Sequence, residues 1–312
     1  MTDRQIQFIK HLNLFPEQVR DILQTVPMQA GRLSARQCTE LIKNLGIDLE
    51  ELMVRLIPLA KIYAVAPVSR FQVGAVAMAG AESNPGEIEL YLGANMEFMH
   101  QALNQTIHAE QSATMHAWHR GARLLHAVAS SEALCGYCRQ FLIEFEKNDE
   151  IVVITPVSEN ITYRKTPLSD LLPDAFGPFA LNNQSGLMPK TSRDRRLRLK
   201  VAAKDRTVSE ALLAAERSYA PYTKNFAGCA MQSVTGEIYS GRYMESAAYN
   251  PSLTPLQSAI LCMNMDMVGE NRSIYRVVLV EKPAAVTQRK SVELLLGSWA
   301  PGINLEYFEA EE

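Results

Sequence analysis

The residues best suited to chemistry in this chain are one histidine, one glutamate and two cysteines. His108 and Glu110 flank a single residue, and further along the chain Cys135 and Cys138 flank two. Two cysteines three apart on a first helical turn point their sulfurs the same way, and the helix start favours the thiolate form. Residues two apart do not share a face in mid-helix, so His108 and Glu110 converge only around a helix start. The spacing therefore predicts two helix starts that face one another.

These four side chains have the composition of a catalytic zinc site. Zinc is bound tetrahedrally by nitrogen and sulfur, and three protein ligands leave a fourth position for water, whereas four close a structural site. We expect His108, Cys135 and Cys138 to bind one Zn²⁺ per subunit, which would lower the pKa of the bound water. Glu110 would not be a ligand but would transfer protons to and from this water. The same His-x-Glu and Cys-x-x-Cys pattern is typical of zinc nucleobase deaminases, and this match implies that Glu110 passes protons to a ring nitrogen and to departing ammonia.

A structural zinc site is the alternative at these residues, and it would need a fourth ligand. His116, His119 and His126 are the candidates. They lie on or beyond the body of the helix that begins near His108, where packing or surface exposure is the simpler interpretation. His100 is likewise interpreted as structural.

Composition narrows the class of protein. The chain has 312 residues, of which 47% are hydrophobic and 21% charged, as in a soluble globular protein of two modest domains. The net charge of −3 disfavours a nucleic-acid partner, and the five cysteines fit no disulfide framework. The sequence contains no signal-peptide pattern and no apolar run long enough to span a membrane. We therefore expect a cytoplasmic protein with no membrane partner.

Hydrophobic periodicity predicts an α/β chain, with mixed sheets covered by helices. Short helices are expected before Leu49, and a longer helix from Glu50 to about Tyr63, interrupted at Pro58. The other expected helices run from Thr106, as cap, to Gly121 and from Cys135 to about Glu146, and the expected strands are 71–78, 88–93, 127–129 and 151–155.

The second half of the sequence repeats the first. Residues 67–75 align with 221–229, residues 93–97 with 241–245, and residues 107–113 with 253–259. In the second copy Thr254 replaces His108, Leu256 replaces Glu110, and no Cys-x-x-Cys follows. The scaffold is kept, but the metal-binding atoms are lost.

This repeat sets the expected domain limits. They are a helical N-terminal segment 1–49, a catalytic zinc deaminase domain 50–181, a linker 182–204 and a degenerate non-catalytic deaminase-like domain 205–312. The basic run from Lys190 to Lys200 lies in this linker and is interpreted as a solvated face rather than a nucleic-acid site.

At these residues the chain resembles the cytidine deaminase family, specifically its longer, homodimeric bacterial type. The segments that carry the resemblance are 69–75, 93–98, 106–113, 135–140, 172–178 and the degenerate second unit, which together extend over most of the chain. The resemblance implies two tandem cytidine-deaminase-like units and hydrolytic deamination of cytidine and 2′-deoxycytidine to uridine and 2′-deoxyuridine in pyrimidine salvage. It also implies a homodimer in which Phe176 reaches an active site across the interface.

The resemblance implies further substrate-binding residues. Asn95 and Glu97, with Met96 between them, resemble the pair that holds the ribose 3′-hydroxyl, and Phe71 resembles the aromatic residue that packs against the pyrimidine. The backbone N–H of Ala109 would bind the carbonyl oxygen of the base. A carboxylate near the sugar would repel a phosphate, so we expect poor activity on CMP.

The sequence departs from the family pattern at two positions. Leu134 stands where the family usually has proline before the first cysteine, and Arg70 stands where many members have asparagine before the pocket aromatic. Proline there fixes the entry into the helix. Leu134 removes no ligand, so we expect activity to survive.

Two other functions remain open on the sequence. A deaminase of bases within RNA or DNA would need a basic channel and base flipping, which the net acidity and the sugar-binding pair disfavour. A non-catalytic zinc-stabilised scaffold would have no use for Glu110 as an unligated carboxylate beside the metal.

Overall fold

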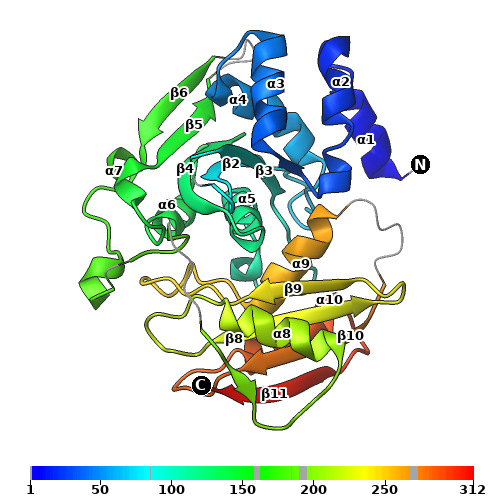
Figure 1. Ribbon diagram of the computed structural model, residues 1–312, viewed down its shortest axis with the longest axis vertical. Helices are drawn as coiled ribbons and strands as arrows, with labels where there is room; N and C mark the ends of the chain where they lie inside the picture. Colours follow the sequence, from blue (N-terminus) through cyan, green and yellow to red (C-terminus); the bar gives the residue numbers. More distant parts are fainter. Residues whose placement is uncertain (1, 85, 158–161, 184, 190–194, 267–272) are drawn as a thin grey trace.

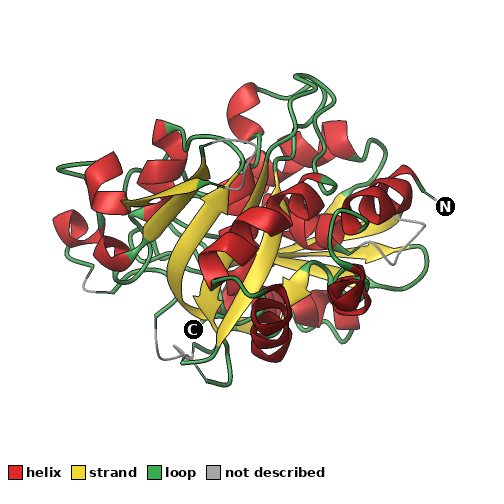
Figure 2. Cartoon of the chain, turned by 90° about the horizontal axis from the view of Figure 1, so that it is seen from above, coloured by secondary structure: helices red, strands yellow, loops and turns green. Residues whose placement is uncertain are grey.

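The computed structural model describes residues 2–84, 86–157, 162–183, 185–189, 195–266 and 273–312. Two sheets dominate it, and helices cover both (Figures 1 and 2). The first has strand order β1-β3-β2-β4-β5-β6, and the second has strand order β7-β11-β10-β8-β9. Both sheets are mixed, since β4 and β5 run parallel, as do β10 and β11, while their other pairings are antiparallel. The α/β prediction is confirmed.

The N-terminal segment is helical, as expected, but it also completes the first sheet. Its elements are α1 (Asp3–Leu12), α2 (Glu17–Leu23), η1 (Pro27–Gln29), β1 (Arg32–Leu33) and α3 (Ala35–Leu45). Thr2 and Ser34 begin α1 and α3 with capping boxes. Strand β1 pairs antiparallel with β3, so this segment covers a sheet edge, which the sequence pattern did not predict.

Helix α4 (Leu49–Lys61) contains Pro58 without interruption, so the predicted break there is wrong. A proline inside a helix costs about 3 kcal/mol. Helix α4 packs against β2 and β3 and buries seven of its residues, and this packing outweighs the local cost.

The remaining elements of the first unit include the central helix α5, which packs against β2, β3 and β4. They are β2 (Gly74–Gly80), β3 (Ile88–Ala94), η2 (Leu103–Gln105), α5 (Ala109–His119), β4 (Arg123–Ser130), α6 (Gly136–Leu142), η3 (Asn148–Glu150), β5 (Val152–Pro156), β6 (Tyr163–Pro167), α7 (Leu168–Leu171) and η4 (Pro178–Leu181). Every residue of β2 is buried, because α4 and α5 both pack against it. Two predicted limits differ from those observed. The first strand begins at Gly74 rather than at Phe71. The helix that follows Cys135, α6, ends at Leu142 rather than near Glu146.

The second unit repeats this order of helices and strands. Its elements are β7 (Arg198–Leu199), α8 (Arg206–Glu216), β8 (Ala227–Ser233), β9 (Ile238–Arg242), α9 (Pro255–Met265), β10 (Ile274–Glu281), α10 (Arg289–Trp299) and β11 (Leu305–Glu311). The repeat extends to close contacts. A Cβ built on Gly93 would lie 2.1 Å from the backbone nitrogen of Ala113, and one on Gly241 would lie 2.1 Å from that of Ala259. In each unit, the glycine allows the central helix to approach the sheet.

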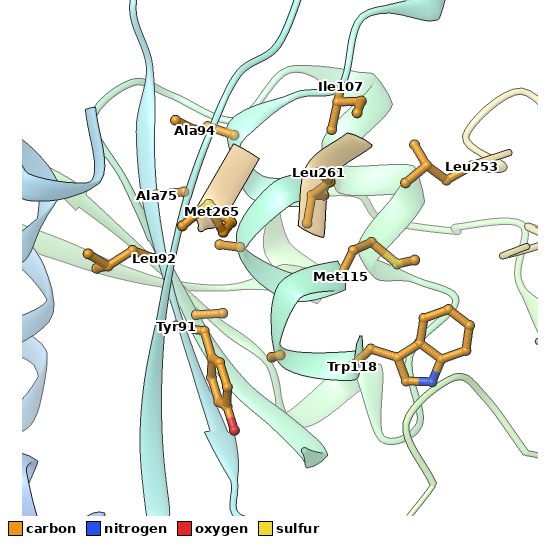
Figure 3. Close-up of a cluster of buried hydrophobic side chains, with 14 of the residues drawn as sticks. Ala75, Tyr91, Leu92, Ala94, Ile107, Met115, Trp118, Leu253, Leu261 and Met265 are labelled. Carbon is orange, nitrogen blue, oxygen red and sulfur yellow. The ribbon is translucent and has the colours of Figure 1, made fainter. Parts of the chain in front are cut away.

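The two units meet through their central helices, α5 and α9. Figure 3 shows Met115 and Trp118 of α5 on the side that faces Leu253 and Leu261 of the second unit, and all four side chains are buried. The hydrophobic core is therefore continuous across the two units. Within the described ranges, no helix has the length and hydropathy to cross a bilayer.

The basic run of the predicted linker lies partly outside the described residues, at 190–194. Three of its described members contact the second unit. Arg198 and Lys200 form ion pairs with Glu311 and Glu309, and the guanidinium of Arg195 lies 3.2 Å from the ring centroid of Phe226. These contacts favour a structural role for the described part of the run.

Candidate metal and catalytic site

His108 and Cys135 each occupy the residue that begins a helix. His108 is the N-cap of α5, and its backbone N–H donates to Gln111 Oε1 at 3.1 Å. Cys135 is the N-cap of α6, and its Sγ accepts a hydrogen bond from the backbone N–H of Cys138 at 3.5 Å. Thr106, the predicted cap, instead follows η2, because the next residue, Ile107, pairs with Met96 beyond the end of β3 and the chain stays extended until His108.

The two helix starts bring three possible metal ligands together. The ligand atoms of His108, Cys135 and Cys138 all lie within 4.8 Å of one another, and Cys135 Sγ lies 3.5 Å from His108 Nδ1. A nitrogen and a sulfur bound tetrahedrally to one zinc ion would be separated by about 3.6 Å. Thiolate and imidazole are ligands that suit zinc. The residues present therefore fit a zinc ion, and within the described part of the chain this group contains no fourth protein ligand.

Glu110 lies beside this group on the first turn of α5. Its carboxylate is buried and accepts a hydrogen bond from Ser130 Oγ at 2.9 Å, while the Sγ of Cys138 donates to its other oxygen at 3.2 Å. Ser130 ends β4 and fixes the direction of the carboxylate. Sequence reasoning missed Ser130, and the available signal was a polar residue directly after the apolar run 127–129.

The three ligand candidates perturb one another. Hydrogen bonds from Cys138 and His108 lower the pKa of the Cys135 thiol to about 3. The hydrogen bond to Cys135, together with burial and the Glu110 carboxylate, raises the pKa of Cys138. The hydrogen bond to Cys135 also raises the pKa of His108. Negative charge on sulfur is therefore favoured at Cys135, which is the exposed member of the group.

The other histidines of this region are not part of the group. His116 is buried, with its Nδ1 2.9 Å from the carbonyl oxygen of Leu92. His119 packs against Trp118, and His126 lies on β4. A closed, four-ligand zinc site therefore has no support from them.

The expected sugar-binding residues lie at the end of β3, next to the metal group. Met96 pairs through its backbone with Ile107, the residue that precedes His108. The side chain of Asn95 accepts a hydrogen bond from the N–H of Val73 at 2.9 Å and donates to the carbonyl oxygen of Phe71 at 2.9 Å. Asn95 thus organises the loop that presents the Phe71 ring.

Glu97 organises the neighbouring turn. Its carboxylate accepts hydrogen bonds from the N–H of Val68 at 2.9 Å, from the N–H of Ser69 at 3.0 Å and from the Ser69 hydroxyl. Burial alone would raise the pKa of Glu97, but these three donors outweigh it and lower the pKa. The counterpart of Glu97 in the second unit, Glu245, accepts from Tyr222 N at 2.8 Å and Thr223 N at 3.1 Å. This carboxylate therefore has a loop-building role that persists in the unit without metal ligands.

The remaining predicted site residues are Ala109, Phe71 and Phe176, which lie on three segments of the first unit. Ala109 is the first residue of α5, where a backbone N–H has no partner within the helix. Phe71 is 55% exposed on the loop before β2, and Phe176 is 49% exposed on the segment after α7. The carbonyl oxygen of Phe176 accepts a hydrogen bond from Gln140 of α6 at 2.7 Å, which holds this segment near the helix of the two cysteines.

Comparison with known proteins agrees with this geometry. Residues 37–155 and 168–293 each match a family described as "Cytidine and deoxycytidylate deaminase zinc-binding region". The fold and the site thus define two tandem zinc-deaminase-like units, and among the residues that the structure describes only the first unit carries a group of metal ligands.

Curated relatives that carry the name "Cytidine deaminase" include the following three. The one from Sodalis glossinidius is 43% identical over 269 residues, which are 83% of this chain and 83% of the relative. The one from Photobacterium profundum is 39% identical over 280 residues, with 89% of each chain covered, and the one from Photorhabdus laumondii is 40% identical over 267 residues, with 85% of each covered. The chain belongs to the cytidine deaminase family.

Proposed function

We propose that this protein hydrolyses cytidine and 2′-deoxycytidine to uridine and 2′-deoxyuridine, with release of ammonia, in pyrimidine salvage. The observation that carries the proposal is the group of three zinc-type ligands at two facing helix starts, with the carboxylate of Glu110 beside it. The names of the relatives support the nucleoside substrate.

His108, Cys135 and Cys138 would hold the zinc ion. A zinc ion bound there would supply a Lewis acid that makes a water molecule acidic at neutral pH. Glu110, oriented by Ser130, would take a proton from that water and deliver it to N3 of the pyrimidine. As the new C4–O bond forms and the C4–N bond breaks, Glu110 would transfer the second proton to the leaving ammonia, which balances the hydrolysis.

Substrate selection would come from the residues around this centre. The N–H of Ala109 would donate to the carbonyl oxygen of the base, and Phe71 would pack against the ring. Asn95 and Glu97, with Met96 between them, would bind the ribose 3′-hydroxyl. Because its hydrogen-bond donors lower the pKa of Glu97, the carboxylate is ionised at neutral pH and would repel a 5′-phosphate, so CMP should be a poor substrate.

The experiment follows the ultraviolet change on incubation of zinc-loaded protein with cytidine, deoxycytidine, CMP or a cytosine-containing oligonucleotide. Glu110→Gln should retain zinc and lose about 10²–10⁴-fold in kcat, the usual contribution of a general acid–base group. Glu132→Gln, a carboxylate whose side chain is 45% exposed, is the matched control. Turnover of CMP or the oligonucleotide as fast as cytidine, or an active Glu110→Gln variant, would contradict the proposal.

We also propose that the active form is a cytoplasmic homodimer, in which Phe176 contacts the site of the partner subunit. The half-exposed aromatic ring beside the cysteine helix supports this arrangement. Sedimentation should give a mass of about twice 34.8 kDa, and Phe176→Ala should raise KM for cytidine. A monomer at assay concentrations, with full activity, would contradict it.

The domain limits 50–181 and 205–312 are kept as a proposal, with 182–204 as the linker. Two separate matched regions, 37–155 and 168–293, support a division of the chain into two units, and the second region begins before the proposed linker. Limited proteolysis should cut first between residues 182 and 204.

A further inference from the structure

Tyr137 lies between the two cysteines and has no role in the chemistry described so far. Its ring stacks on the imidazole of His108, with ring centroids 5.1 Å apart and planes inclined by 27°. Its hydroxyl donates a hydrogen bond to the backbone carbonyl of Asn250 at 2.9 Å. Asn250 belongs to the second unit, in the loop between β9 and α9. One side chain thus touches both a metal-ligand candidate and the unit that lacks ligands.

A second contact joins the same loop to the same histidine. Gln111 accepts from the backbone N–H of His108 through Oε1, and its Nε2 donates to the carbonyl oxygen of Pro251 at 3.3 Å. Residues 250 and 251 therefore contact His108 through two intermediaries, one at its ring and one at its backbone.

The internal repeat separates these two contacts. Gln257, the counterpart of Gln111, donates to the carbonyl oxygen of Gln105 at 2.7 Å, so the glutamine contact occurs in both directions. The second unit has no Cys-x-x-Cys segment, so the tyrosine contact has no counterpart there. The contacts of Gln111 and Gln257 therefore belong to the packing between the two units. The contact of Tyr137 occurs only from the unit that carries the ligands.

We propose that Tyr137 is a positioning residue, through which the second unit of the same chain fixes the imidazole of His108 and so determines how firmly the site retains zinc. A ring stacked on the imidazole limits its rotation, and the hydroxyl bond to Asn250 limits movement of the tyrosine. Residues that orient a metal ligand typically change metal affinity by 10–100-fold when they are replaced. The inference rests on the zinc site of the proposed function.

The test measures zinc release from the full-length, zinc-loaded protein to an excess of a chromogenic chelator, without substrate. Tyr137→Leu removes both the ring and the hydroxyl, and should release zinc about ten-fold faster or more. Tyr137→Phe keeps the stacked ring and loses the hydroxyl bond, so its release rate should lie between that of Tyr137→Leu and the parent. Tyr163→Phe on β6, which loses the hydroxyl bond to Asp48 at the start of α4, is the matched control and should behave as the parent.

A positioning role also predicts how the kinetic constants divide. In Tyr137→Leu, kcat should fall while KM for cytidine changes little, since the sugar-binding residues are untouched. Zinc release from Tyr137→Leu at the parental rate would overturn the inference. If that variant does not fold, as judged by circular dichroism, an unchanged rate in Tyr137→Phe would overturn it. Because release is measured without substrate, a protein inactive on cytidine would refute the proposed function and leave this test intact.

Discussion

Gly93→Ala adds a single methyl group between β3 and α5. We predict that it lowers both the stability of the fold and the catalytic rate, and that the two effects can be measured separately. A Cβ there would lie 2.1 Å from the backbone nitrogen of Ala113 and 2.5 Å from its Cα, whereas ordinary contacts begin at 3.4 Å. In Gly93→Ala, helix α5 must therefore move from β3 by about 1 Å, because the contact is backbone and no flexible side chain can yield. That helix carries His108 and Glu110 at its first turn.

The expected cost has two parts. Overpacking of this kind destabilises a protein by about 1–3 kcal/mol. A misplacement of about 1 Å at reacting groups can reduce turnover about 100-fold. Thermal unfolding followed by fluorescence measures the first part, and initial rates on saturating cytidine, at a temperature where the variant is folded, measure the second.

The second unit supplies the matched control. In Gly241→Ala the new Cβ would lie 2.1 Å from the backbone nitrogen of Ala259, so the clash is the same, but α9 carries no ligand. This variant should lose similar stability and keep kcat within a few-fold of the parent. Equal losses of kcat in the two variants, or an unchanged kcat in Gly93→Ala, would show that this glycine does not set the geometry of the site.

Three further predictions concern stability. Burial lowers the pKa of His116 to about 3, so the side chain stays neutral in the folded protein. In the unfolded chain its pKa is near 6.5, and it binds a proton below that pH. The free energy of unfolding should therefore fall by about 1.4 kcal/mol per pH unit below pH 6.5. His116→Asn, which retains a donor for Leu92, should reduce that slope in urea unfolding between pH 7 and 5, and parallel profiles would contradict this. Arg70 has a left-handed backbone conformation (φ 60), which asparagine adopts more readily than arginine. Arg70→Asn should therefore stabilise the protein by about 0.5–1 kcal/mol, and a lower Tm in this variant would contradict the prediction. A Cβ on Gly297 of α10 meets no atom within 4 Å, so Gly297→Ala should gain about 1 kcal/mol from helix propensity, measured as a higher Tm and contradicted by a lower one.

The sequence was sufficient for features with a period or a repeat. The alternation of strands and helices predicted the layers, and the aligned halves predicted two units of one fold. The spacing of His108, Cys135 and Cys138 also predicted two helix starts, but the predicted cap Thr106 lies two residues too early, because the pairing of Ile107 with Met96 delays the start of α5.

Features that depend on tertiary contact were not predictable in this way. Strand β1 has two residues, too few for an alternating pattern, and it exists because β3 offers an open edge. The local sequence around Pro58 predicts a break in the helix. The residues of α4 before and after Pro58 are buried, and this packing maintains the helix. Ser130 and Tyr137 act through partners distant in sequence, at Glu110 and Asn250, and only the structure shows those distances.

The helix start at His108 also has a consequence for the history of the chain. Thr254 occupies the same cap in the second unit, and Gln257 returns to its backbone N–H at 2.9 Å, as Gln111 does to His108 at 3.1 Å. The cap serves folding with either side chain, so exchange of histidine for threonine abolishes a ligand without removing the start of the helix. In a duplicated unit, loss of this metal ligand is therefore compatible with an intact start of the central helix.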